Sequence, residues 1–168
     1  MNPQQAALFD VLNEAISSQT TVSFVAVDQN DALSQQVRIG DHGRAQGISP
    51  LTNQHVIDVG DMATLGSNGL LTGQGALGHE IKEGFEIQSK NLTTNAQITD
   101  AHAAAINAES KITGVRIFGA NENIANSNVL EVTVSIPQVR GELRPAINTR
   151  VQLRFSNMQL INTVNNQK

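Results

Sequence analysis

The first segment of the chain has its apolar residues at helical spacing. These residues are Leu8, Leu12, Ala15 and Ile16. Asn2 followed by Pro3 is a pair typical of a helix start, because the asparagine side chain accepts hydrogen bonds from free backbone N–H groups and proline fits the first turn. We therefore expect a helix over residues 3–17 that turns one apolar face inward.

Segments rich in β-branched residues follow this helix. Residues 21–27, 35–39 and 54–59 have the composition and partial alternation of short strands, and we predict a small sheet from them. Two glycine-containing segments, 40–50 and 66–75, separate the later elements. Glycine and proline interrupt regular structure, so both segments are predicted as loops.

Helical spacing returns in the middle of the chain. Residues 75–90 place Leu77, Ile81 and Phe85 on one side of a predicted helix. A second helix is predicted over residues 99–111, with Thr99 or Asp100 as its cap and Gly114 just beyond its end. The connection between the two helices is short, so we expect them to be antiparallel neighbours.

The last third of the chain has a β pattern. Segments 114–118, 128–139 and 148–163 are β-branched or alternate apolar with polar residues, and we predict that they form a C-terminal antiparallel β-hairpin. The predicted architecture is one α+β domain over residues 1–168. It combines a small sheet, an N-terminal helix, an antiparallel helix pair and the C-terminal hairpin.

Composition narrows the chemistry that this chain can perform. The net charge is −4, and the 11 Lys and Arg residues form no basic cluster, so we expect no nucleic-acid partner. There is no Cys, so a metal ion would need His, Asp or Glu ligands. The first helix lacks the basic start and apolar run of a signal peptide, and no segment is long and apolar enough to span a membrane. We therefore expect a soluble chain without a membrane partner.

The predicted middle helices carry the candidate chemistry. In the sequence GHEIKEGFEIQ, His79 and Glu83 are four residues apart and lie on one helix face. An imidazole and a carboxylate one turn apart can bind a metal ion together, while Glu80 could reach a water on that ion. On the second helix, His102 and Glu109 share a stripe that could face the first.

The segment HEIKE resembles the His-Glu-x-x-His helix of the zincin metallopeptidases. The order of predicted elements, with short strands and a glycine-rich loop before this helix, is similar to that of compact zincin-like effector and toxin peptidases of bacteria. His79 and Glu80 match that motif, whereas Glu83 stands in place of the second histidine, and the resemblance covers residues 54–110. It implies metal ligation by His79 and Glu83, a third ligand from the second helix, and Glu80 as general base. The third ligand would be His102 or Glu109. The metal would be zinc, with manganese or iron as alternatives, and the substrate would be a peptide or protein.

Two other interpretations stay open. The acidic residues of this helix could form a solvated face, with Lys82 and Glu86 as an i, i+4 ion pair. The chain could also be a catalytically inactive zincin-like or unrelated protein-interaction module that binds through its C-terminal hairpin or its amide-rich surface. A surface rich in Asn and Gln suits a secreted, an injected or a cytosolic protein equally, so composition assigns no compartment.

Overall fold

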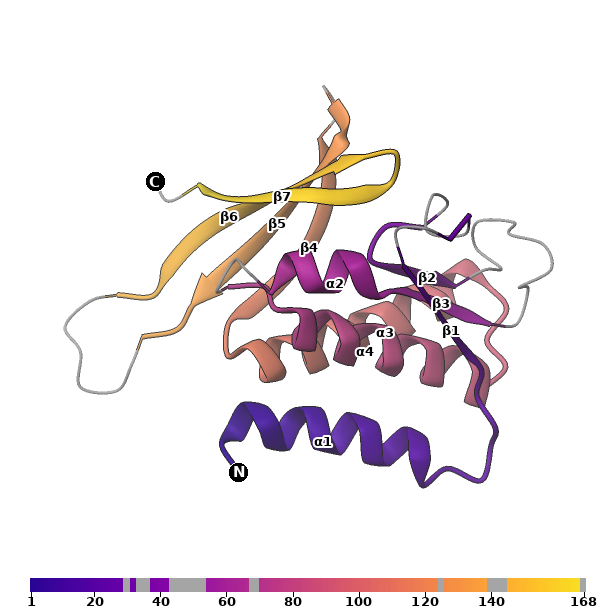
Figure 1. The fold of residues 1–168 in the computed structure, drawn as a ribbon. Helices are drawn as coiled ribbons and strands as arrows, with labels where there is room; N and C mark the ends of the chain where they lie inside the picture. Colours follow the sequence, from indigo (N-terminus) through magenta and orange to yellow (C-terminus); the bar gives the residue numbers. More distant parts are fainter. Residues whose placement is uncertain are drawn as a thin grey trace.

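The protein has a mixed α+β fold in the computed structural model, which describes residues 1–28, 31–32, 37–42, 54–66, 70–123, 126–138 and 145–166 (Figure 1). The described helices are α1 (Pro3–Ile16), α2 (Val59–Leu65), α3 (Gly73–Ser89) and α4 (Asn95–Thr113). The described strands are β1 (Phe24–Val27), β2 (Gly40–His42), β3 (His55–Asp58), β4 (Arg116–Asn123), β5 (Asn126–Ile136), β6 (Ile147–Ser156) and β7 (Gln159–Asn166). The expected fold class is confirmed. Among the described segments, every helix is too short or too polar to reach across a bilayer.

The strands form two sheets. In the first, β3 lies between β1, to which it is parallel, and β2, to which it is antiparallel. In the second, β4, β5, β6 and β7 are antiparallel neighbours in chain order. The expected C-terminal hairpin therefore belongs to a sheet of four strands. Residues 148–163 divide into two strands because Asn157 and Met158 both have positive φ, of 49° and 69°, which is the backbone of a tight hairpin turn.

The helix ends follow local capping chemistry. Asn2 accepts a hydrogen bond from the Gln5 N–H at 2.8 Å, and the Gln5 side chain accepts one from the Asn2 N–H, which confirms the predicted start of α1. Gly114 ends α4 with φ of 76°, as expected. The predicted cap of α4 was wrong: Thr94, not Thr99 or Asp100, caps it, because Gln97 completes a capping box there.

Two elements differ from the prediction between residues 35 and 66. Residues 37–39 are not a strand, and β2 lies one residue further on, inside the segment predicted as a loop. Helix α2 was not anticipated. It begins directly after β3 because the buried Asp58 side chain accepts hydrogen bonds from the N–H groups of Gly60 and Asp61. Residues 35–36, 43–53 and 67–69 of the predicted strands and loops lie outside the described part of the chain.

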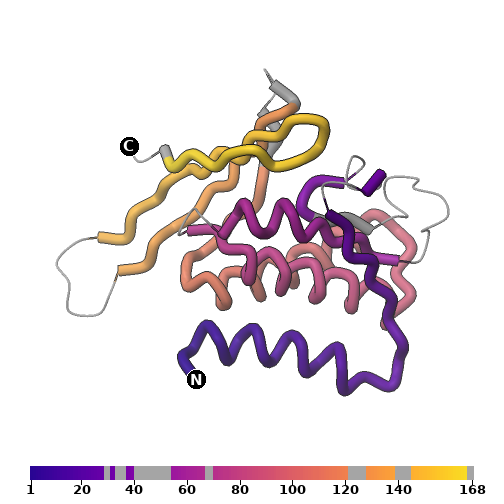
Figure 2. The backbone as a smooth tube through the Cα atoms, viewed as in Figure 1, coloured from indigo at the N-terminus to yellow at the C-terminus, as the bar shows by residue number. Residues whose placement is uncertain are grey.

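The main core lies between the C-terminal sheet and helices α2 and α3. Leu65 of α2 and Ala76 of α3 pack in one cluster with Val134, Val151 and Leu153 of the sheet. Helix α1 contacts α3 and α4 on their other side, away from the C-terminal sheet (Figure 2). The helix pair is therefore a middle layer, covered by the sheet on one side and by α1 on the other.

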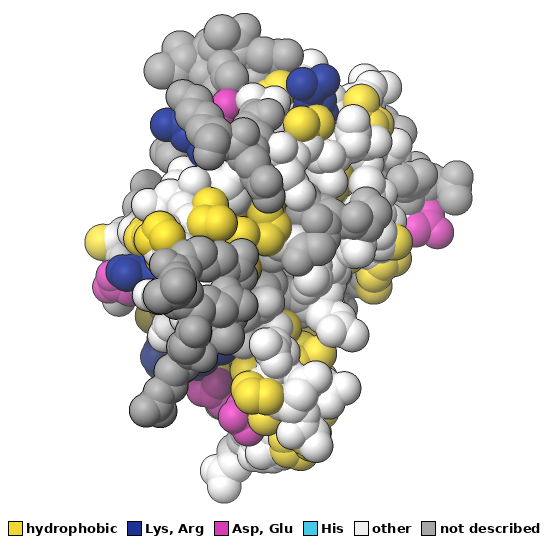
Figure 3. Space-filling view, turned by 90° about the vertical axis from the view of Figure 1, so that its left-hand side faces the viewer, with side chains coloured by type: hydrophobic (Ala, Val, Ile, Leu, Met, Phe, Trp, Pro, Cys, Tyr) yellow, Lys and Arg dark blue, Asp and Glu magenta, His cyan; other side chains and the backbone are white. Residues whose placement is uncertain are grey.

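Exposed apolar side chains are scattered over the surface. Figure 3 shows one face, on which hydrophobic side chains occur in separate groups among polar ones. Among the residues that the structure describes, the large exposed hydrophobic ones are Met1, Phe9, Ile16, Val59, Phe118 and Ile161. Isolated apolar side chains of this kind are normal on a protein surface, so they do not by themselves indicate a docking site.

Asp61 joins the two sheets from inside the protein. Its fully buried carboxylate accepts a hydrogen bond from the Ile39 N–H at 3.0 Å, next to β2, and from the Leu160 N–H of β7 at 2.6 Å. Burial raises the pKa of Asp61, while the two backbone hydrogen bonds oppose that rise. Ile39 has a φ of 65°, which is unfavourable for a β-branched residue, so this hydrogen bond also helps to hold a strained turn.

We expect Asp61→Asn to destabilise the protein by about 1–3 kcal/mol, because an amide has one acceptor oxygen and would leave one of the two backbone N–H groups without a partner. Urea unfolding measures the change. Asp10→Asn, on the exposed side of α1, is the matched control and should stay within about 0.5 kcal/mol of the parent. Equal stability of both variants would contradict this role of Asp61.

Candidate metal centre

Helices α3 and α4 pack closely because α3 has glycines where α4 crosses it. A Cβ atom at Gly75 would lie 2.5 Å from the Thr113 side chain, and one at Gly78 would overlap the end of Ile112. The contacts pair early residues of α3 with late residues of α4, so the two helices are antiparallel neighbours, as predicted. This approach brings the ionisable side chains of the two helices within contact distance.

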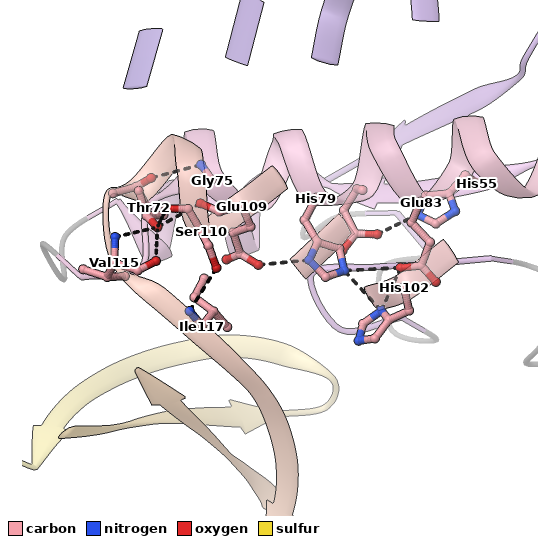
Figure 4. A network of polar contacts seen from close by, with 12 residues as sticks. His55, Thr72, Gly75, His79, Glu83, His102, Glu109, Ser110, Val115 and Ile117 are labelled. Carbon is pink, nitrogen blue, oxygen red and sulfur yellow. Dashed lines mark hydrogen bonds and ion pairs between the residues drawn. The ribbon is translucent and has the colours of Figure 1, made fainter. Parts of the chain in front are cut away.

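His79, Glu83 and His102 meet at the centre of this helix pair (Figure 4). His79 Nε2 lies 3.3 Å from Glu83 Oε2 and 3.2 Å from His102 Nδ1, and these last two atoms are 3.0 Å apart. The three atoms thus form a nearly equilateral triangle. Nitrogen and oxygen ligands bound to zinc at about 2.0–2.1 Å in a tetrahedron are separated by roughly 3.3 Å, which is close to these sides.

Glu109 occupies a different position from the other three. Its Oε2 lies 2.9 Å from His79 Nδ1, on the opposite side of the imidazole ring from Glu83 and His102 (Figure 4). A carboxylate on the second nitrogen of a metal-binding histidine fixes the orientation of the ring and increases its basicity. Of the two expected third ligands, His102 completes the triangle, whereas Glu109 binds the other ring nitrogen of His79.

The cluster runs from the buried His79 to the exposed His102, and its charged groups lie in contact with one another. Burial of His79 disfavours its charged form, but hydrogen bonds to Glu109 and Glu83 outweigh burial and raise the pKa of His79 well above its usual value. Burial acts against the charge of Glu83 too, yet its contacts with His102 and His79 hold its pKa well below the usual value. Glu83 and Glu109 therefore favour a positive charge at the position of His79.

Glu80 points toward a third histidine, His55, for which no role was predicted. His55 on β3 is fully buried, and its Nε2 lies 2.6 Å from Glu80 Oε2. Gly84 allows this contact, since a Cβ there would lie 2.9 Å from His55 and 2.7 Å from the Phe24 ring. The available signal was one histidine in a strand of otherwise aliphatic and acidic residues, but nothing in its spacing links it to Glu80.

The acidic residues of α3 do not form one solvated face. Glu80 is 7% exposed, and the side chain of Glu83 is 13% exposed, so neither is in open solvent. The expected Lys82–Glu86 ion pair exists, with Nζ and Oε1 2.7 Å apart. Lys82 also binds Glu14 of α1 at 2.7 Å, so this side of α3 holds α1 in place and is separate from the His79 cluster.

A cavity of about 290 Å³ adjoins the cluster. One wall is polar and includes His79, Glu80, Glu83, His102 and Glu109. The other walls come mainly from α2, the segment before α3, and the inner face of the C-terminal sheet. Glu80 and the three triangle residues therefore line the same space.

No protein family, curated protein or solved structure matches this chain. The zincin resemblance stays a prediction that depends on residues 54–110 and on the geometry of the helix pair.

We expect the metal-free protein to lose stability as the pH rises from about 6.5. The folded pKa of His79 lies above its unfolded value, so its stabilisation is complete below the unfolded pKa and is lost as the pH passes through the folded pKa. The slope should reach at most about 1.4 kcal/mol per pH unit. Urea unfolding between pH 6 and 9 measures it, and His79→Gln should remove this component. The same slope in the parent and the variant would contradict the coupling of His79 to its carboxylates.

Proposed function

We propose that this chain is a zincin-like metal-dependent hydrolase, most simply a peptidase, with its metal held by His79, Glu83 and His102. The observation that carries the proposal is the triangle of donor atoms with sides of 3.0, 3.2 and 3.3 Å. Three protein ligands and one open position are typical of catalytic zinc sites, whereas structural sites use four.

The donor set fits zinc. Two imidazoles and one carboxylate form a ligand combination found at catalytic zinc sites. Manganese or iron could also bind, because imidazole and carboxylate ligands suit them as well. A bound zinc ion would supply Lewis-acid polarisation of a carbonyl group and a water of lowered pKa.

Glu80 is the proposed general base. It lines the same cavity as the three ligands, and its charge contributes to the raised pKa of His79, which indicates that it lies near the centre. His55 binds Oε2 of Glu80 and so limits the orientations of the carboxylate. A base held in this way can accept a proton from a water molecule in the cavity without being a metal ligand.

Strand β4 is the proposed support for a peptide substrate. It is an edge strand of the C-terminal sheet, and its residues Gly119 and Ala120 line the cavity beside the cluster. The pairing with β5 is irregular between Ile117 and Ala120. An extended peptide can add to an exposed sheet edge through backbone hydrogen bonds, and here that edge leads to the candidate metal centre.

The alternative is an inactive interaction module. It is favoured by the carboxylate at residue 83 in place of the second histidine, and by the hydrogen bonds that connect the cluster residues to one another. In that case the cluster would serve as a buried ion-pair network that holds α3 and α4 together. A measurement of metal binding therefore distinguishes the proposed hydrolase from the interaction module.

The parent chain should bind one zinc ion, measured by calorimetry and by metal analysis after dialysis. His79→Ala, Glu83→Ala and His102→Ala should each abolish binding, and Glu109→Gln should weaken it by about 10–100-fold. Affinity should rise with pH up to about tenfold per unit, because zinc displaces the proton of His79. Glu14→Gln, away from the cluster, is the control. If the parent chain binds no zinc, manganese or iron, the hydrolase is ruled out and the interaction module remains as the proposed function.

Glu80→Gln should keep the zinc affinity of the parent while hydrolysis of a fluorogenic peptide mixture falls by about 10²–10⁴-fold, as expected when a general base is removed. The comparison of metal content and turnover on the same preparation is the measurement. If Glu80→Gln lost zinc as well, Glu80 would be a ligand or a structural residue instead of a base.

A further inference from the structure

The cavity beside the cluster is apolar except for its metal-side wall and one arginine. Its aliphatic lining includes Leu65, Leu71, Ile106, Leu130, Val132 and Leu153. The cavity lies where the helix pair faces the C-terminal sheet, so both layers contribute side chains to it. Its opening is bordered by the exposed residues His102 and Ala120, next to edge strand β4.

We infer that this cavity binds one uncharged aliphatic group of about the size of a leucine side chain, attached to a head group held at the metal. The placement of the head group at the metal rests on the proposed function. The binding of the aliphatic group in the apolar cavity does not depend on it. A space of about 290 Å³ is at the small end of ligand pockets. Since an apolar cavity of about 150 Å³ admits benzene, this one has room for an aliphatic group of leucine size.

Charge in the lining disfavours an acidic group. Glu80, Glu83 and Glu109 all lie on the wall nearest the head group, and they would repel a carboxylate there. Arg38 is the basic residue in the lining, and its guanidinium group lies 5.2 Å from the centre of the Phe155 ring. An acidic ligand directed by Arg38 is therefore the competing possibility, and the experiment includes it.

Ile106 connects the metal centre to the apolar part of the cavity. It follows His102 by one helical turn on the same face of α4 and is half-buried. A Cβ at Gly119 would lie 4.0 Å from Ile106 Cδ1, so Ile106 is also next to β4. A larger side chain at residue 106 would fill the space nearest the bound head group without replacing a proposed ligand.

The first test compares three hydroxamates on the zinc-loaded 168-residue chain by calorimetry. The compounds are acetohydroxamate, 4-methylpentanohydroxamate and the monohydroxamate of glutaric acid. The branched aliphatic compound should bind at least about tenfold more tightly than acetohydroxamate, and the acidic one should not. Ile106→Phe and Leu130→Phe should bring the ratio close to one without changing zinc affinity. Ile161→Phe, on the exposed side of β7, should keep the parent ratio.

The second test uses xenon on the metal-free chain and follows methyl chemical shifts by NMR. Saturable shifts are expected at Ile106, Leu130 and Val132, and none at the exposed Ile161. If zinc does not bind, the proposed function fails, and the xenon experiment alone tests the apolar site. Saturable methyl shifts would then support the site, and their absence would overturn it. With zinc bound, equal affinities of the aliphatic and acetyl compounds, or tighter binding of the acidic compound, would overturn the inference.

Discussion

The contact between α3 and α4 is the constraint on which the candidate metal centre depends. Gly75 and Gly78 leave no side chain between the helices at their crossing, so the backbones approach closely. Side chains one and two turns further along α3 then meet α4 at the same short distance. A larger residue at either glycine would separate the helices and with them His79 from His102. At Gly75 it would also crowd Glu109, whose Cγ would lie 3.3 Å from the added Cβ.

Charge balance explains why such a cluster can exist in a buried place. Glu83 and Glu109 supply two negative charges on either side of the His79 ring. A proton on His79 compensates one of them, and the contact of Glu83 with His102 offsets part of the other. Burying unpaired charge is unfavourable by several kcal/mol, so a divalent cation in this place would compensate better than one proton. The carboxylate at residue 83, where the zincin motif has a histidine, adds negative charge to the proposed site and would favour a doubly charged ion there.

Two buried polar contacts connect helices to the sheets, one from α3 through Glu80 and one from α2 through Asp61. His55 anchors Glu80 to β3, the central strand of the first sheet, while Asp61 joins β7 of the C-terminal sheet to the turn before β2. Because β3 is paired on both sides, it gives Glu80 a rigid partner. The C-terminal sheet, in turn, closes the cavity over the helices and presents its edge strand β4 beside the cluster. The same arrangement therefore creates both the polar wall and the apolar walls.

The sequence by itself determined the features that depend on neighbours within a few residues. Caps such as Asn2 and Gly114, and the shared face of His79 and Glu83, follow from local hydrogen bonding and helical period. Only the tertiary structure decided which α4 residue joins them, because His102 and Glu109 lie on one stripe and the helix offset selects between them. The same holds for His55 and Glu80, 25 residues apart, whose contact depends on how α3 packs against β3 through Gly84.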